Sequence, residues 1–226
     1  MFRKNSLLIV AVALVLAVPV AHAAGGWTIG VKGGVSKPTG DSGKDLKIGP
    51  DIGIDVGMQV NDRVAVGVEG NWITNTHKDV GKTEQDFPGP GDTYTLDKDK
   101  TTNLSGGVHG KYMFPVSSES KVAPYGLVGL GLYNVKEDYQ ETIVLAADPT
   151  NPIVNTDESD GVKSQTRFGG KFGAGAVYKA TEQVGITLQA EYNIVTVDTK
   201  GAPSGTPSTF KFYGIRAGLN FHVAPK

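Results

Sequence analysis

The chain has 226 residues, no cysteine and a formal net charge of −1 at pH 7. These values exclude disulfides and thiolate zinc sites, and they argue against a nucleic-acid partner, which would favour a basic surface. Glycine is present at about twice its usual share of ~7%, and most of the 31 glycines lie inside alternating apolar segments.

Residues 1–23 have the organisation of a secretory signal peptide. A basic start precedes an almost uninterrupted apolar run over residues 6–20, and residues 21–23 have the small-x-small pattern of a signal peptidase site. The apolar run is shorter than the ~20 residues that a membrane-spanning helix needs. We therefore expect cleavage after Ala23, with residues 24–226 forming one domain.

From residue 24 onward, polar and apolar residues alternate with a period of two. Seven segments alternate strictly over about nine to eleven residues, which is the length of a tilted membrane strand. They cover residues 27–35, 52–60, 64–72, 104–114, 168–178, 184–192 and 213–221. An eighth segment, residues 124–135, is less regular, and we expect Val128, Leu130 and Leu132 to form its lipid-facing side.

The connections between these segments are alternately short and long. Residues 61–63, 115–123 and 179–183 are brief connections, whereas residues 73–103 and 136–167 are very long ones. Short periplasmic turns and long external loops are typical of outer-membrane barrels, and such long loops are unusual in a compact soluble domain. The sequence therefore predicts an all-β fold, an eight-stranded antiparallel up-and-down transmembrane β-barrel with both termini in the periplasm.

The two faces of the alternating segments indicate which solvent each face meets. The apolar face of the seven regular segments carries no charged residue, and a Lys or Arg at the bilayer midplane would cost roughly 2–4 kcal/mol. The other face is rich in small residues, which suit the narrow interior of an eight-stranded barrel. A lipocalin-like soluble barrel would instead turn its apolar face inward. We therefore expect the apolar face to meet lipid.

Aromatic residues lie near the ends of the regular segments, as expected of girdles at the two membrane interfaces. The predicted lower girdle contains Trp27, Tyr112, Phe114, Tyr178 and Phe221, and the predicted upper girdle contains Trp72, Phe168, Tyr192 and Tyr213. Strands are rich in aromatic residues in general, but this sorting to the segment ends favours interfacial anchoring.

Six charged residues fall on the predicted lumen side, namely Lys32, Asp55, Glu69, Lys111, Glu191 and Arg216. A buried charge is costly unless it is paired, and the six residues include three of each sign. We expect a salt-bridge network that plugs the lumen. A second interpretation is a switchable gate, in which the charges exchange partners and open a narrow passage.

Two short motifs resemble those of small outer-membrane barrels. Residues 124–133 read Pro-Tyr-Gly-Leu-Val-Gly-Leu-Gly-Leu-Tyr, and residues 214–221 read Gly-Ile-Arg-Ala-Gly-Leu-Asn-Phe. They resemble an inner strand and the closing strand of the family that includes the OmpA transmembrane domain, OmpX and the opacity-type porin-family proteins. This resemblance implies a Gram-negative cell envelope and contact with outer-membrane lipid and lipopolysaccharide. It also implies that periplasmic chaperones and the β-barrel assembly machinery act on the protein, and that the protein is a monomer.

Three functional hypotheses follow from these patterns. The leading one is a non-enzymatic envelope or surface-interaction role through the long external loops, with an extracellular ligand that the sequence does not identify. The alternative is a narrow porin-like channel for small solutes. A lipid-modifying enzyme would need Ser, His and a carboxylate within hydrogen-bond reach. That hypothesis is disfavoured because His109 points inward and His77, with Asp79, lies in a long connection.

No metal or cofactor is expected. Residues 155–161 resemble a calcium-binding loop only faintly, since they lack the required glycine and the segment lacks the final glutamate. The sequence contains no phosphate-cradling loop, and its histidines are too scattered to form a metal cluster.

Overall fold

The computed structural model describes residues 26–40, 43, 45–85, 93–117, 119–144, 156–197 and 208–223. The expected signal peptide lies outside these residues. The strands within them are β1 (Trp27–Thr39), β2 (Gly49–Gln59), β3 (Val64–Thr76), β4 (Thr83–Gln85), β5 (Thr93–Met113), β6 (Val122–Val144), β7 (Thr156–Lys179), β8 (Val184–Val197) and β9 (Ser208–Val223). In these ranges no helix is long and apolar enough to cross a membrane.

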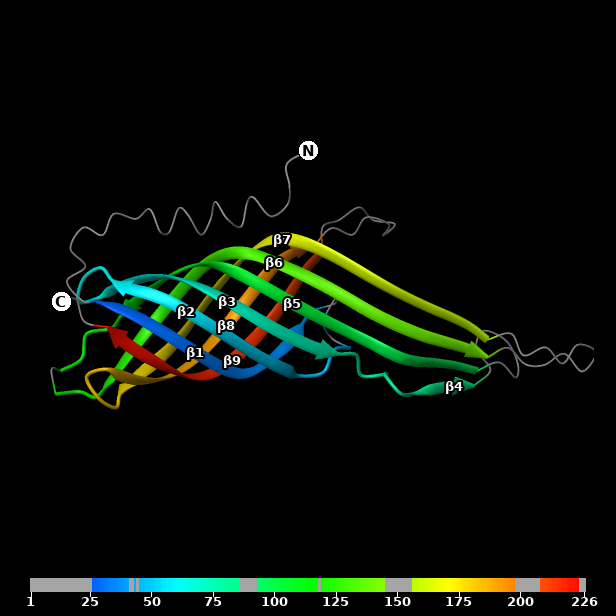
Figure 1. Cartoon of the computed structure of the whole chain (residues 1–226), viewed down its shortest axis with the longest axis horizontal. Helices are drawn as coiled ribbons and strands as arrows, with labels where there is room; N and C mark the ends of the chain where they lie inside the picture. The colour runs from blue at the N-terminus through cyan, green and yellow to red at the C-terminus, as the bar shows by residue number, and fades with distance from the viewer. Residues whose placement is uncertain are drawn as a thin grey trace, which may run out of the picture.

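Eight of the strands close into a barrel (Figure 1). The sheet order is β3-β2-β1-β9-β8-β7-β6-β5-β4, and a further pairing between β3 and β5 closes the ring. All of these pairings are antiparallel. The short strand β4 lies beside β5, outside the ring. The predicted eight-stranded up-and-down barrel is therefore confirmed.

The hydrogen-bonding register determines how far the strands are tilted. A line of paired residues starts at Trp27 and passes through Met58, Val66, Gly110, Val128, Phe172, Tyr192 and Tyr213 before it returns to β1 at Lys37. One circuit of the barrel therefore climbs ten residues along β1. With eight strands, this stagger corresponds to a tilt of about 40° and to an interior that side chains can fill.

Two of the tight turns at one end of the barrel are held by side chains. Asn61 Oδ1 accepts hydrogen bonds from the backbone N–H groups of Arg63 and Val64, both at 2.9 Å. In the turn between β7 and β8, Thr181 Oγ1 accepts a bond of 2.9 Å from the N–H of Val184. Asn and Thr side chains stabilise turns by such bonds, which explains why the chain reverses here within a few residues.

Side-chain burial alternates along the barrel strands. In β1, for example, Lys32 and Ser36 are buried, whereas Val31 and Val35 are exposed. Successive side chains of a strand point to opposite faces, so the polar residues face the lumen and the apolar residues face outward. This arrangement is the reverse of that in a soluble barrel and matches a barrel surrounded by lipid.

The less regular strand β6 has the facing that the sequence analysis expected. Val128 and Leu130 are 65% and 55% exposed, whereas Tyr125 and Leu127 are 1% and 4% exposed. Leu132 lies on the same outward face and is half-buried. The aliphatic side of β6 therefore continues the outer wall, and the ring of Tyr125 enters the lumen.

The expectation that residues 73–103 and 136–167 are loops is wrong over much of their length. Strands β5, β6 and β7 contain 21, 23 and 24 residues, and they extend past the other strands at the end opposite the tight turns (Figure 1). β6 pairs with β7 from Val122 to Val144. The projecting sheet contains little apolar alternation, because it extends beyond the lipid-facing wall. Backbone hydrogen bonds and cross-strand polar pairs form it instead.

Candidate functional site in the barrel lumen

Asp55 is the centre of a buried ion cluster on the lumen side of β1, β2 and β5. Its carboxylate oxygens lie 2.9 Å from Lys32 Nζ and 3.0 Å from Lys111 Nζ. Lys32 and Asp55 are almost completely buried, while Lys111 keeps some contact with solvent. Each charge therefore has an opposite partner, as burial requires.

Glu191 is the centre of a second cluster, formed by β2, β3, β7, β8 and β9. One of its oxygens is ion-paired with Arg216, and the other lies 3.3 Å from Lys171 Nζ. Lys171 is also ion-paired with Glu69. Arg216 Nε lies 3.6 Å from an oxygen of Asp51. A single carboxylate thus holds two cations, each of which has a further acidic neighbour.

His109 and Gln189 connect the two clusters. His109 Nε2 lies 4.0 Å from Asp55, and its Nδ1 lies 3.9 Å from Glu69. Gln189 Oε1 accepts a hydrogen bond of 3.3 Å from Lys32. Its amide nitrogen donates a bond of 2.8 Å to the central carboxylate of the second cluster. The structure thus places all six lumen charges that the sequence analysis named in one continuous charged layer.

Two members of the charged layer, Lys171 and Asp51, were not predicted from the sequence. With them, the described residues contribute four cations and four carboxylates, which are Lys32, Lys111, Lys171, Arg216, Asp51, Asp55, Glu69 and Glu191. The signal for both was present in the alternation. Lys171 occupies an inward position in the segment 168–178, and Asp51 directly precedes the segment 52–60.

An apolar cap lies next to the charged layer, on the side of the projecting strands. Its members are at most 8% exposed and comprise Leu46, Ile73, Tyr133, Val195, Phe210 and Phe212. The rings of Tyr133 and Phe212 meet edge to face at 6.4 Å. This cap was not predicted from the sequence, because five of its six members lie between the alternating segments. The charged layer and the apolar cap both lie in this part of the lumen.

The aromatic residues expected in the girdles lie on the outer wall. Trp27, Tyr112, Phe114, Tyr178 and Phe221 lie at the end with the tight turns, and Trp72, Phe168, Tyr192 and Tyr213 lie towards the projecting strands. All are exposed except Tyr192, which is half-buried. The ring of Tyr192 packs between those of Phe172, at 5.5 Å, and Tyr213, at 4.6 Å. Phe172 therefore joins this aromatic group, although the sequence analysis left it out.

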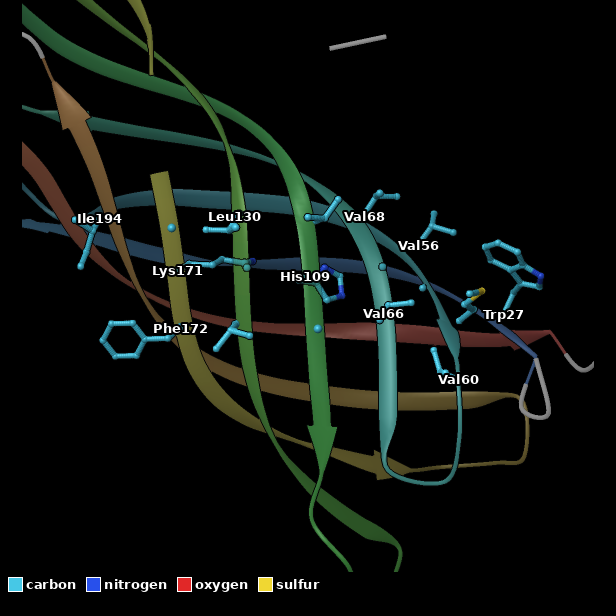
Figure 2. A pocket seen from close by; sticks show the side chains of 18 residues that line it. Trp27, Val56, Val60, Val66, Val68, His109, Leu130, Lys171, Phe172 and Ile194 are labelled. Atoms are coloured by element: carbon cyan, nitrogen blue, oxygen red, sulfur yellow. The ribbon is translucent and has the colours of Figure 1, made fainter. Parts of the chain in front are cut away.

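Between the two aromatic zones the outer wall is hollowed and apolar (Figure 2). Side chains that line this hollow include Val56, Val66, Val68, Leu130, Phe172 and Ile194. His109 on β5 and Lys171 on β7 belong to the same part of the wall, but their side chains are buried because they point into the lumen. The wall therefore presents hydrocarbon outward and keeps its charges inside, as a lipid environment requires.

Neither His77 nor His109 forms a catalytic triad with the residues around it. His109 faces two carboxylates of the charged layer, and His77 Nδ1 lies 3.6 Å from Asp79, which is itself bound by Lys82. Neither arrangement includes a serine hydroxyl in the part of the chain that the structure describes. Within the described part of the chain, no group of three or more His, Asp or Glu side chains is arranged so that it could hold a metal ion.

Residues 8–222 match the sequence profile of the family described as outer membrane protein beta-barrel domain. The chain belongs to this family. This member of the outer membrane protein beta-barrel domain family is therefore an outer-membrane barrel of the bacterial envelope, which sits in the membrane with lipids or lipopolysaccharide. No curated protein matches its sequence.

Solved structures of outer-membrane proteins resemble this family member. Neisserial surface protein A (NspA) is 18% identical, with 87% of this chain and 97% of that chain covered, at a TM-score of 0.52. Ail, the attachment invasion locus protein of Yersinia pestis, is 12% identical, with 88% and 99% covered, at a TM-score of 0.44. OprG from Pseudomonas aeruginosa is 12% identical, with 89% and 98% covered, at a TM-score of 0.47. The likeness to NspA supports the barrel fold and nothing further.

Proposed function

We propose that this protein is a non-enzymatic barrel with a filled lumen, which serves the cell envelope and binds partners at the cell surface through its projecting strands. The observation that carries this proposal is the content of the lumen. An ion that crossed the barrel would lose its hydration at the apolar cap and then meet charges that already compensate one another.

The projecting parts of β5, β6 and β7 support a role in surface interaction. Polar pairs join their strands: Lys98 Nζ lies 2.8 Å from Asp138, and the Tyr94 hydroxyl donates a hydrogen bond of 3.1 Å to Glu141. Cross-strand pairs of this kind stabilise a sheet. A rigid scaffold that holds polar segments in water is a common platform for recognition.

One edge of the projecting sheet is open among the described residues. β7 begins at Thr156, but its pairing with β8 begins only at Gly169. The opposite edge is covered by β4 and by the backbone of residues 77–81. An unpaired edge strand presents backbone donors and acceptors that an extended peptide can bind. Residues 156–166 are therefore our candidate contact for an extracellular protein.

The proposal places both termini in the periplasm. Trp27 at the start of β1 pairs with Val223 at the end of β9, at the same end as the tight turns. This orientation exposes the projecting strands outside the cell, in the manner of other outer-membrane barrels. We further propose that residues 1–23 are a signal peptide that is removed and that residues 24–226 form the barrel domain. Periplasmic chaperones would deliver this domain to the β-barrel assembly machinery, which would insert it as a monomer.

A narrow channel for small solutes is the second candidate function, and one contact favours it. Arg216 is paired with Glu191, while its Nε lies 3.6 Å from Asp51. Arg216 therefore has a second carboxylate within reach. An exchange of partners would rearrange the charged layer without leaving this cation unpaired.

Ion conductance of the refolded mature protein in a planar bilayer tests the proposal against the channel. A heat-induced shift on a gel first establishes that the barrel is folded. We expect a folded protein that shows no discrete openings. Reproducible openings of the folded protein would overturn the filled-lumen proposal and favour the channel.

A further inference from the structure

A hollow of about 270 Å³ lies at the rim of the barrel, on the side of the projecting strands. We call it the rim hollow, and its lining residues are Asp45, Leu46, His77, Asp99, Thr101, Glu137 and Tyr139. They come from the connection between β1 and β2, the residue that directly follows β3, and the projecting parts of β5 and β6. Leu46 also belongs to the apolar cap, so the rim hollow adjoins the cap.

The rim hollow is strongly acidic. Asp45, Asp99 and Glu137 contribute three carboxylates, and its described lining contains no Lys or Arg. Lys98, which is close in sequence to Asp99, is engaged elsewhere by Asp138. Like charges around one hollow repel each other, and a bound cation relieves that repulsion.

The buried residue Thr101 and the half-buried residue Asp99 add to this effect of charge. Thr101 is only 6% exposed and lines the rim hollow, and its hydroxyl has no hydrogen-bond partner among the described residues. Asp99 lies in the projecting part of β5, beyond the lipid-facing wall. Burial raises the pKa of its carboxyl above the ordinary value, and the nearby His77 offsets part of this effect. A partly dehydrated carboxylate and a hydroxyl without a described protein partner would both gain from a bound N–H donor.

The lining residues indicate the type of cation. Carboxylates form their strongest hydrogen bonds with charged N–H donors. Tyr139 adds an aromatic ring, which attracts alkylammonium groups, and Leu46 adds an apolar contact. The described residues contain no group of three or more His, Asp or Glu arranged to hold a metal ion. A hollow of about 270 Å³ accommodates an alkyl chain with its ammonium group.

We propose that the rim hollow binds an organic cation that carries primary ammonium groups, supplied either by a free polyamine or by lysine side chains of a peptide. The carboxylates of Asp99, Glu137 and Asp45 accept the N–H donors, and the hydroxyl of Thr101 accepts a further one. This site is separate from the open edge of β7 and goes beyond the proposed function.

Calorimetric titration of spermidine, and separately of trilysine, into the refolded mature protein in detergent micelles tests this proposal. We expect saturable binding of at least one probe. Asp99→Asn and Glu137→Gln should each weaken it by about tenfold, because each removes a charge-assisted hydrogen bond. Thr101→Val, which leaves the net charge unchanged, should weaken it by about threefold.

Asp138→Asn is the matched control, because it removes the same charge from the residue next to Glu137, where the carboxylate is bound by Lys98. Its affinity should equal that of the unaltered protein. Binding of spermidine alone identifies a free amine as the source, and binding of trilysine alone identifies a peptide. The proposal is overturned if neither probe binds, if Asp138→Asn weakens binding as much as Glu137→Gln, or if Mg²⁺ displaces the probe at equal concentration. A heat-shift gel confirms that each variant is folded.

Discussion

Lys171 Nζ on β7 lies 3.3 Å from Glu191 Oε2 on the neighbouring strand β8, inside the barrel wall. The same ammonium group is ion-paired with Glu69 on β3, a strand that has no pairing with β7. All three side chains are at most 8% exposed. One lysine therefore ties together parts of the barrel that the sheet does not join directly.

Removal of that lysine should destabilise the barrel strongly. Lys171→Met leaves Glu69 and Glu191 buried without this cation, and we expect the free energy of unfolding to fall by about 3 kcal/mol. Urea unfolding in lipid vesicles, followed by the fluorescence of Trp27 and Trp72, measures this change. Combining Lys171→Met with Glu69→Gln should recover part of the loss. A double variant as unstable as the sum of the two single variants would show that the two side chains are not coupled.

The apolar cap should act as a barrier to ions. Phe210→Ala combined with Phe212→Ala removes two rings from the cap, and we expect discrete openings in a planar bilayer that the unaltered protein lacks. Phe221→Ala is the control, because it removes a ring of similar size from the outer wall. A folded cap variant that remains silent would mean that the charged layer alone seals the lumen.

Neutralising one carboxylate separates the filled lumen from a salt-bridge gate. Glu69→Gln disturbs the charged layer but leaves the apolar cap in place, so our proposal expects no increase in conductance. A gate that opens by exchange of partners would instead conduct more often once Lys171 lost this partner. The comparison requires folded protein at equal reconstitution density, with channel openings counted over equal times.

A charged side chain on the outer wall should lower the free energy of unfolding more near the middle of the bilayer than at its edge. Val128 on β6 is 65% exposed, and Val122 at the start of the same strand is 46% exposed. We expect Val128→Arg to lower the free energy of unfolding by about 2–4 kcal/mol and Val122→Arg by about 0–1 kcal/mol. Urea unfolding in vesicles measures both changes. Equal costs at the two positions would contradict the placement of this wall in lipid.

Amide hydrogen exchange should reveal the open edge of β7. From residue 156 to residue 166 the strand pairs only with β6 among the described residues, whereas from Gly169 onward it pairs with both β6 and β8. We expect alternate amides to exchange quickly in the first part and nearly all to be protected in the second. Uniform protection in residues 156–166 would show that another segment covers this edge, and would remove it as a candidate binding surface.

The barrel wall could be predicted from the sequence because its cause is local. A period of two, repeated over eight segments, identifies both strands and faces, and lipid tolerates no charge on the outward face. The wall positions of Trp27 and Tyr213 follow from the same rule, as does the inward facing of Glu69 and Arg216. The projecting parts of β5, β6 and β7 escaped this reasoning, because beyond the lipid no apolar pattern marks them as strands.

Alternation within one strand determined which side chains enter the lumen, and only the tertiary structure decided which of them meet. The partners of Lys171 depend on a stagger of ten residues around the closed ring, which no single segment contains. The same closure brings Phe212 from β9 against Tyr133 from β6 and so forms the apolar cap. The wall is a consequence of local periodicity, whereas the contents of the lumen depend on how all eight strands are tilted and joined.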